Sequence, residues 1–195
     1  MASIRPVVLA SRSPRRIDIL NQLGVEHVVI PADIDESPLA DEDPMSYVQR
    51  LAIEKARAVL ARVDSTSTVL AADTTVDVDG QILGQPIDEA DSRRMLQLLS
   101  GRTHQVHTGV AVISAAGESV EVVTSRVTFV DISPTLLDWY LETGESVGKA
   151  GSYAIQGHGA SLVLATEGSM SNIIGLPKAQ TARLLGITPP NASGK

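Results

Sequence analysis

Short apolar runs alternate along the first third of the chain with segments whose apolar positions recur every three or four residues. Residues 4–10 and 25–30 are short and rich in valine, which predicts two strands. Residues 14–23 and 44–62 have helical spacing, and each follows a serine or an aspartate of the kind that caps a helix N-terminus. The chain therefore opens with a predicted strand, helix, strand and helix.

The centre of the chain combines a buried strand with an acidic residue. Residues 69–72 are wholly apolar, Asp73 follows them, and the apolar pattern resumes at residues 76–78. Asp79-Gly80 then predicts a tight hairpin turn back into residues 81–83. Burying an unpaired carboxylate costs free energy, so an interaction that offsets this cost is expected at Asp73. A metal ion or a proton transfer would supply one, and a turn-capping aspartate is the equally weighted alternative.

The rest of the chain has the same mixed pattern. His104 and His107 lie in strand-like sequence three residues apart, so we expect them on opposite faces of a sheet and not at a shared metal. From residue 88 the pattern predicts a helix to Leu99, two long strands over 103–113 and 119–129, a helix from Pro134 through Tyr140, a strand over 161–166 and a last helix over 177–185.

Composition narrows the class of protein. The chain has 195 residues, 43% of them hydrophobic, with a net charge of −7 and no cysteine, which excludes disulfides and thiolate chemistry. We find no apolar run near the roughly 20 residues of a membrane span and no secretory signal. The acidic balance and the few aromatic residues argue against stable nucleic-acid binding. We therefore expect a cytoplasmic protein without membrane contact.

The first predicted helix begins with a cluster of hydroxyl and cationic side chains. Ser11, Arg12, Ser13, Arg15 and Arg16 surround its N-terminus. Free N–H groups at a helix N-terminus attract anions, and guanidinium groups bind phosphate in a bidentate fork. The cluster therefore suggests a phosphate site, and the alternative is a pair of solvated surface arginines.

Two further segments carry candidate polar groups. Residues 31–43 form an acidic loop, in which one or two carboxylates could bind a hard cation such as magnesium. Lys55 on the second helix is either solvated or a phosphate contact. Residues 144–159 are rich in glycine, with Lys149 and Gln156 as their polar groups, and glycine at this density allows close approach of a ligand. The segment matches neither a Walker A loop nor a dinucleotide-binding motif.

Five separated motifs combine into a resemblance that covers nearly the whole chain. They are Leu9–Arg16 with Leu20; Ala71–Thr74 with Gly80, Leu83-Gly84 and Pro86; Leu99–His104 with Thr108–Val110; Lys149–Gly157; and Asn172 with Ile174–Pro177. Each motif is weak alone, but in this order the set resembles the Maf family of nucleoside triphosphate pyrophosphatases.

The resemblance implies an α/β fold with a long twisted mixed β-sheet flanked by helices, in two lobes around a central cleft, like inosine triphosphate pyrophosphatases. Residues 1–187 would form this single two-lobed domain, and residues 188–195 a flexible tail. The implied reaction is hydrolysis of a nucleoside triphosphate to the monophosphate and pyrophosphate, with magnesium or manganese as the divalent cofactor. The resemblance also implies assembly as a homodimer.

The resemblance assigns roles to particular residues. Asp73 would be the proton acceptor that activates water, and it would share the metal with Glu36. Arg15, Thr74 and Gln156 would set base specificity, and this trio resembles the branch of the family that acts on dTTP and UTP. The residues implied in phosphate and metal binding are Ser11, Arg16, Glu36, Lys55 and Lys149.

One position departs from the family pattern. Gln85 stands where the family usually has lysine, so a cation near the phosphates is lost there. Two alternative functions also stay open. One is a pyrophosphatase that prefers purine or 7-methyl-GTP substrates, and the other is a non-catalytic nucleotide-binding regulator of septum formation.

Overall fold

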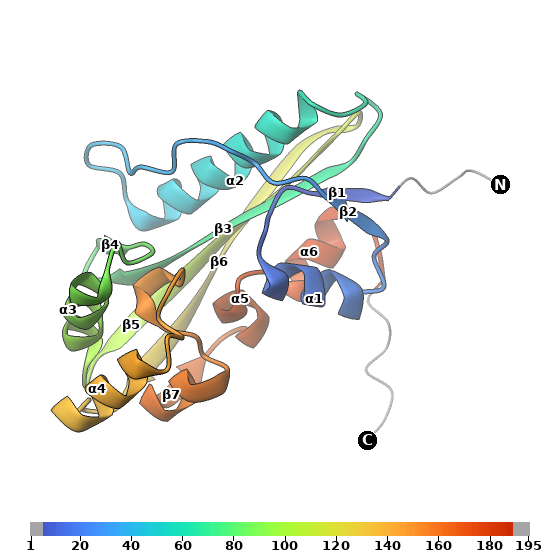
Figure 1. Cartoon of the computed structure of the whole chain (residues 1–195). Coiled ribbons are helices and arrows are strands. Elements are labelled where there is room, and N and C mark those ends of the chain that lie inside the picture. Colours follow the sequence, from blue (N-terminus) through green and yellow to red (C-terminus); the bar gives the residue numbers. More distant parts are fainter. Residues whose placement is uncertain (1–5, 189–195) are drawn as a thin grey trace, which may run out of the picture.

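The computed structural model describes residues 6–188 as a mixed sheet flanked by helices (Figure 1). The sheet has seven strands in the spatial order β2-β1-β3-β5-β6-β7, and β4 pairs with β3. The strands are β1 (Val7–Leu9), β2 (His27–Val29), β3 (Val69–Val78), β4 (Gln81–Leu83), β5 (Thr103–Ser114), β6 (Gly117–Phe129) and β7 (Val163–Glu167).

The helices lie on both faces of this sheet. Val69 and Ala71 of β3 pack in one apolar cluster with the long helix α2, whereas Leu70 and Ala72 pack in another with α1 and α6. This alternation is the period of two that a strand buried on both faces requires. The helices are α1 (Pro14–Gln22), α2 (Pro44–Leu60), α3 (Glu89–Leu99), α4 (Pro134–Glu142), α5 (Met170–Ile174) and α6 (Lys178–Leu184), with short 3₁₀ helices at η1 (Ala150–Ser152) and η2 (Gly157–Leu162).

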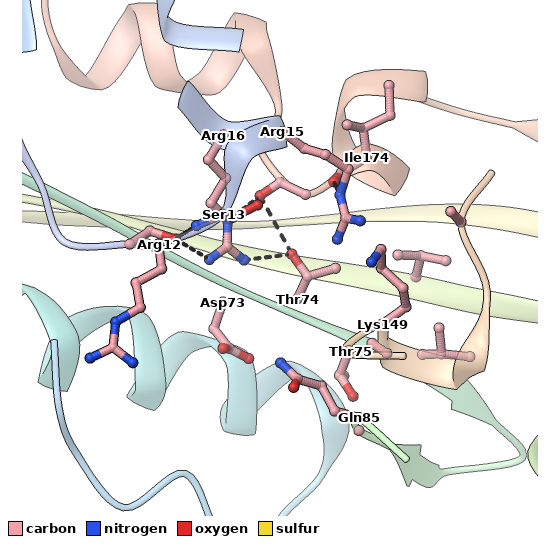
Figure 2. Close-up of a pocket in the computed structure, with 18 of the residues that line it drawn as sticks. Arg12, Ser13, Arg15, Arg16, Asp73, Thr74, Thr75, Gln85, Lys149 and Ile174 are labelled. Atoms are coloured by element: carbon pink, nitrogen blue, oxygen red, sulfur yellow. Dashed lines mark hydrogen bonds between the residues drawn. The ribbon is translucent and has the colours of Figure 1, made fainter. Parts of the chain in front are cut away.

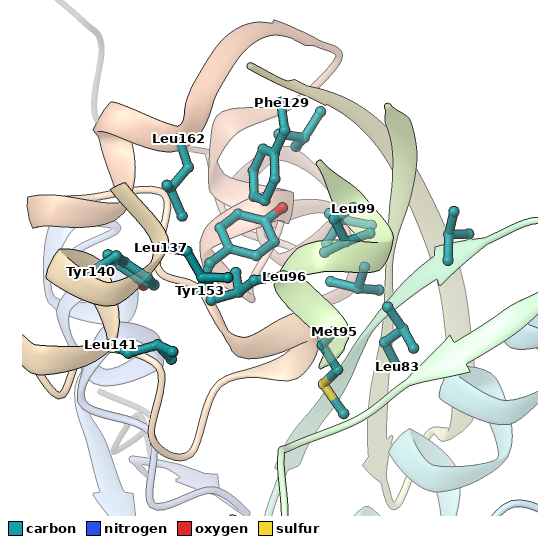
Figure 3. Packing of buried hydrophobic residues seen from close by; sticks show 14 residues of the cluster. Leu83, Met95, Leu96, Leu99, Phe129, Leu137, Tyr140, Leu141, Tyr153 and Leu162 are labelled. Carbon is teal, nitrogen blue, oxygen red and sulfur yellow. The ribbon is translucent and has the colours of Figure 1, made fainter. Parts of the chain in front are cut away.

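A third apolar cluster fills the other end of the sheet (Figure 3). Phe129 and Tyr153 meet edge to face, with ring centroids 4.7 Å apart, and His104 contacts both rings. Leucines from α3 and α4 close around them. This cluster fixes the glycine-rich segment that runs from α4 to η2, because Tyr153 belongs to that segment.

One edge of β3 is open over five residues. β1 runs parallel to β3 and its pairing ends at Leu70, whose carbonyl accepts from Ala10 N at 2.8 Å. β4 pairs antiparallel with the same edge only from Val76 onward. Across the part of the chain that the structure describes, no strand pairs with residues 71–75 on this side. The other edge of β3 is paired with β5 throughout residues 69–77.

The structure confirms the predicted fold class and most of the predicted elements. Three local differences stand out: β3 runs through Asp73 without a break, β2 covers only residues 27–29, and the short helix α5 was not predicted. In residues 6–188 no helix is both long and apolar enough to cross a membrane. The two-lobed division of residues 1–187 stays a prediction, and most of the predicted tail, residues 189–195, lies outside the described residues, as do residues 1–5.

Candidate active site

A cavity of about 480 Å³ lies beside the open edge of β3, between the end of β1 and the start of β4. Its walls come from the β1–α1 connection, the acidic loop before α2, the centre of β3, the residues just after β4, the glycine-rich segment and the end of α5. The structure brings every predicted site residue into this one cavity: Ser11, Arg15, Arg16, Glu36, Lys55, Asp73, Thr74, Lys149 and Gln156.

Asp73 projects from β3 on the side of the sheet that α2 covers. Lys55 of α2 donates to Asp73 Oδ1, with 2.6 Å between the two atoms, and also lies 2.9 Å from Glu36 Oε2. The side chains of Lys55 and Asp73 are each 9% exposed, whereas that of Glu36 is 48% exposed. Two carboxylates therefore converge on one ammonium group, and Glu36 is the member that faces solvent.

Burial raises the pKa of Asp73 above its ordinary value, while the positive charges of Lys55 and Arg16 oppose that shift. The cause is desolvation, which disfavours the charged form of a carboxylate. A carboxylate whose pKa is raised is a better proton acceptor than one left in water. The surroundings of Asp73 therefore suit a group that takes a proton from a bound water.

Arg16 projects into the cavity from the first turn of α1. Its guanidinium donates to Gly175 O at 2.8 Å, to Ser11 Oγ at 3.1 Å and to Thr74 Oγ1 at 3.1 Å. Burial lowers the pKa of Arg16, and the nearby Asp73 raises it. Arg15 donates to Ile174 O at 3.1 Å, and burial lowers its pKa too. Both guanidinium groups are thus anchored through Nε to backbone carbonyls at the end of α5.

Thr74 faces the side of the sheet opposite to Asp73, toward Arg16 (Figure 2). Its Oγ1 lies 2.9 Å from Thr108 Oγ1, and Thr108 donates to Asn172 O at 3.0 Å. Asn172 is fully buried, and its amide nitrogen donates to Val106 O and to Ser125 Oγ, both at 2.9 Å. A chain of hydrogen bonds therefore links Arg16 to the turn that carries α5.

Lys149 and Gln156 enter from the glycine-rich segment, on the far wall of the cavity. Lys149 Nζ donates to Val147 O at 3.1 Å. Burial lowers the pKa of Lys149, and the positive charge of Arg15 adds to the shift. Gln156 is exposed at the N-terminus of η2, with its side-chain amide free of other hydrogen bonds within residues 6–188. Lys149 therefore adds a third cation to Arg15 and Arg16, and Gln156 offers a free donor and acceptor.

The residues present fit a divalent cation whose coordination a ligand completes. The oxygens of Glu36 and Asp73 already share one cation, the Lys55 ammonium. Within residues 6–188 no group of three or more histidine, aspartate or glutamate side chains is placed to hold a metal ion. Magnesium in phosphate-processing sites is commonly bound by one or two carboxylates together with phosphate oxygens and water, and this pair suits that mode.

The sequence as a whole is similar to known proteins. The family described as Maf-like protein matches residues 6–187. The chain belongs to the Maf family. A relative named dTTP/UTP pyrophosphatase from Anaeromyxobacter sp. (strain Fw109-5) is 51% identical over 184 residues, covering 92% of this chain and 87% of the relative. A protein of the same name from Myxococcus xanthus (strain DK1622) is 50% identical over 179 residues, covering 92% and 90%. The solved structure of a HAM1 protein from Coxiella burnetii matches with a TM-score of 0.49 and 15% identity over 93% of this chain and 98% of that one.

This Maf-family site also contains residues to which the resemblance assigned no role. Arg12, part of the cluster at the start of the first helix that suggested a phosphate site, lines the cavity, and within residues 6–188 its guanidinium has no hydrogen-bond or ion-pair partner. Tyr47 of α2 donates from its hydroxyl to Glu36 O at 2.9 Å, and so holds the acidic loop; nothing in the sequence marked it. Gln85 lines the cavity as well, as expected for the position that departs from the family pattern.

Proposed function

We propose that this Maf-family protein hydrolyses nucleoside triphosphates, with dTTP and UTP as its preferred substrates, to the nucleoside monophosphate and pyrophosphate. One observation carries the proposal: the buried carboxylate of Asp73 shares a cavity with the cations of Arg15, Arg16 and Lys149. A triphosphate is a polyanion, and an acidic protein needs clustered cations to hold it. The names of the relatives point to the same substrates.

The reaction breaks the anhydride bond between the α and β phosphates. Asp73 accepts a proton from the attacking water, the water oxygen joins the monophosphate, and pyrophosphate leaves with the bridging oxygen. Lys55 keeps the Asp73 carboxylate oriented, while Arg15, Arg16 and Lys149 stabilise the negative charge on the phosphate oxygens. Glu36 and Asp73 would hold a magnesium or manganese ion, which would supply further charge neutralisation and lower the pKa of a water bound to it.

Base selectivity falls to the wall formed by the glycine-rich segment. Gln156 presents both a hydrogen-bond donor and an acceptor, which suits the imide edge of uracil or thymine. Ala154 and Ile155, just before Gln156, are apolar, and Val76 and Val106 add apolar surface to the same cavity. A polar group in such a pocket rejects the wrong base strongly, because that base would leave it unpaired. We place the reaction in the cytoplasmic nucleotide pool, and the homodimer stays a prediction that light scattering can test.

The test is a pyrophosphate-release assay over UTP, dTTP, CTP, GTP and 7-methyl-GTP, each with magnesium, manganese and cobalt. We expect the highest kcat/KM for UTP and dTTP, and no turnover when a chelator removes the divalent metal. Asp73→Asn should lower kcat by at least about a hundredfold, as when a general base is removed. Asp18→Asn, an exposed aspartate of α1, is the matched control.

Each alternative has its own signature in this assay. A preference for GTP or 7-methyl-GTP would replace the proposed substrates with purine nucleotides. Nucleotide binding by calorimetry without hydrolysis under any of the three metals would favour a regulator over an enzyme. An Asp73→Asn protein with wild-type turnover would remove Asp73 from the proposed role.

A further inference from the structure

The segment that carries Gln156 is held from outside the cavity. Residues 154–159 are hydrogen-bonded to α4 and to the residues just after it, and Gln156 lies midway along them. Ala154, two residues before Gln156, donates its backbone N–H to Tyr140 Oη of α4, with 3.2 Å between the atoms. This contact fixes one side of the segment to a residue whose side chain is fully buried.

Glu145 fixes the other side. Its Oε1 accepts the backbone N–H of His158 at 2.9 Å, and its Oε2 accepts that of Gly159 at 3.0 Å. The carboxylate is seated directly against the turn at Gly157, where a Cβ would overlap Oε1 and where φ is +78°. A residue with a side chain could not occupy that position without moving the carboxylate, so the turn and Glu145 fit each other closely.

The end of α4 also holds Glu145 itself in place. Thr143 Oγ1 accepts from Glu145 N at 3.2 Å and donates to Tyr140 O at 2.6 Å. The ring of Trp139 meets the ring of His158 edge to face, with centroids 5.5 Å apart. Burial raises the pKa of Glu145, but the N–H groups of His158 and Gly159 outweigh it and the net shift is downward, which keeps the group charged. Charged acceptors make the stronger hydrogen bonds.

Glu145 does not line the cavity, and its hydrogen bonds reach the site through this segment. Its charge also acts on Lys149, but that cation faces the phosphates, which UTP and CTP share. We propose that Glu145 is a positioning residue for base recognition: by accepting the N–H groups of His158 and Gly159 it fixes the backbone from which Gln156 reaches the base. The inference rests on the proposed function, because it gives Gln156 the role of reading the base. It predicts that loss of Glu145 lowers the selectivity between bases more than it lowers kcat.

The experiment compares Glu145→Ala and Glu145→Gln with Glu142→Ala, a neighbouring exposed glutamate at the end of α4. For Glu145→Ala we expect KM for UTP to rise about tenfold with little change in kcat, and the UTP-over-CTP ratio of kcat/KM to fall by a similar factor, since an unfixed polar group discriminates poorly. Glu145→Gln keeps one acceptor and should fall between wild type and alanine. Glu142→Ala should match wild type.

A second readout does not depend on catalysis. Amide hydrogen exchange at His158 and Gly159 should speed up in Glu145→Ala and stay unchanged in Glu142→Ala, because only the first loses the acceptors. Unchanged exchange in Glu145→Ala, or an unchanged UTP-over-CTP ratio, would overturn the inference.

The two proposals fail in different ways. If wild type hydrolyses no triphosphate, the proposed function falls. The ratio of the dissociation constants of UTP and CTP, measured by calorimetry in wild type and Glu145→Ala, then decides on Glu145 by itself.

Discussion

Asp73 and Thr74 are adjacent in sequence and serve opposite sides of the sheet. In an extended strand successive side chains point to opposite faces, so Asp73 meets Lys55 of α2 while Thr74 meets Arg16 of α1. Both still reach one cavity, because the edge of β3 is open at this point. Two neighbouring positions thereby join the helix layers above and below the sheet in a single site.

Replacing Lys55 by methionine tests the buried ion pair. The change keeps an unbranched side chain that is one atom shorter and leaves Asp73 and Glu36 without their shared ammonium. Removing the Lys55 cation raises the pKa of Asp73 still further. The acidic limb of the pH profile of kcat/KM should therefore move to higher pH, and kcat should fall by about 10²-fold. Lys178→Met on α6, outside the cavity, is the control. An acidic limb that stays in place would contradict the role of Lys55.

The sequence predicted some of these residues as candidates for the site, but not that Lys55 and Asp73 form an ion pair. Asp73 stood out because an acid interrupts an apolar run, and the arginines because they crowd a helix start. Lys55 lies 18 residues from Asp73, and a helix lysine is normally solvated. Its burial depends on how α2 crosses the sheet, which no local pattern specifies. Tyr47 was missed for the same reason.

At the scale of elements, the site depends on how closely α2 approaches β5. Gly109 of β5 lies under α2, where a Cβ would overlap the carbonyl oxygen of Val48 and lie 2.6 Å from its carbon. No side chain fits between the two backbones. Since Lys55 stands two turns further along α2, the absence of a side chain at Gly109 sets the depth at which its ammonium meets Asp73.

Gly109→Ala should therefore disturb both packing and chemistry. We expect a loss of about 1–3 kcal/mol in the free energy of unfolding, typical of an overpacked core. Urea denaturation measures this loss, and kcat should fall with it because α2 is displaced. Gly84→Ala is the control for stability, since a Cβ there meets nothing within 4 Å. Equal stability of the two variants would show that α2 adjusts without cost.

Helix α5 shows why some elements could not be predicted. Five residues are too few to be helical on their own, so tertiary contacts must hold them. Here the Asn172 side chain does so, through Val106 O and Ser125 Oγ on β5 and β6. These contacts also shape the site, because they position Ile174 O and Gly175 O, which accept hydrogen bonds from Arg15 and Arg16. Local periodicity in the sequence cannot predict such tertiary contacts.

At the scale of the whole molecule, the aromatic cluster contains a histidine that ties stability to pH. His104 is 1% exposed; its Nε2 lies 2.8 Å from Tyr153 Oη, and its Nδ1 has no hydrogen-bond partner among residues 6–188. Burial lowers the pKa of His104 to about 4, from 6.5. The unfolded chain therefore takes up the proton first as pH falls, so folding stability is lost between pH 6.5 and 4.

The expected loss is on the order of 3 kcal/mol for this one group. Denaturation curves at pH 7 and pH 4 measure most of it, and His104→Gln should lose this part of the pH dependence. His27→Gln, on β2 outside the cluster, should retain it. A His104→Gln protein with the same pH dependence as wild type would assign the effect to other groups.

The overall architecture was predictable where elements are long. The runs that became β5 and β6 are long and β-prone, and α2 has a cap and a clear apolar side. The gap in strand pairing beside β3 was not predictable, because it arises from where β1 stops and where β4 starts. The cavity exists only through that gap. The individual helices and strands were thus predictable from local sequence, whereas the position of the cavity depends on pairing between strands that are distant in sequence.

An unpaired stretch in the middle of a sheet edge is normally an invitation to aggregation, since another chain can add its own strand there. Here the unpaired edge is enclosed: Ala71, Ala72 and Thr75 are fully buried, and Thr74 lies within the cavity, where its hydroxyl accepts from Arg16. A strand from another chain would have to enter the cavity and separate Arg16 from its partners before it could pair with β3. The walls that form the site should therefore also protect this edge from association with a second chain.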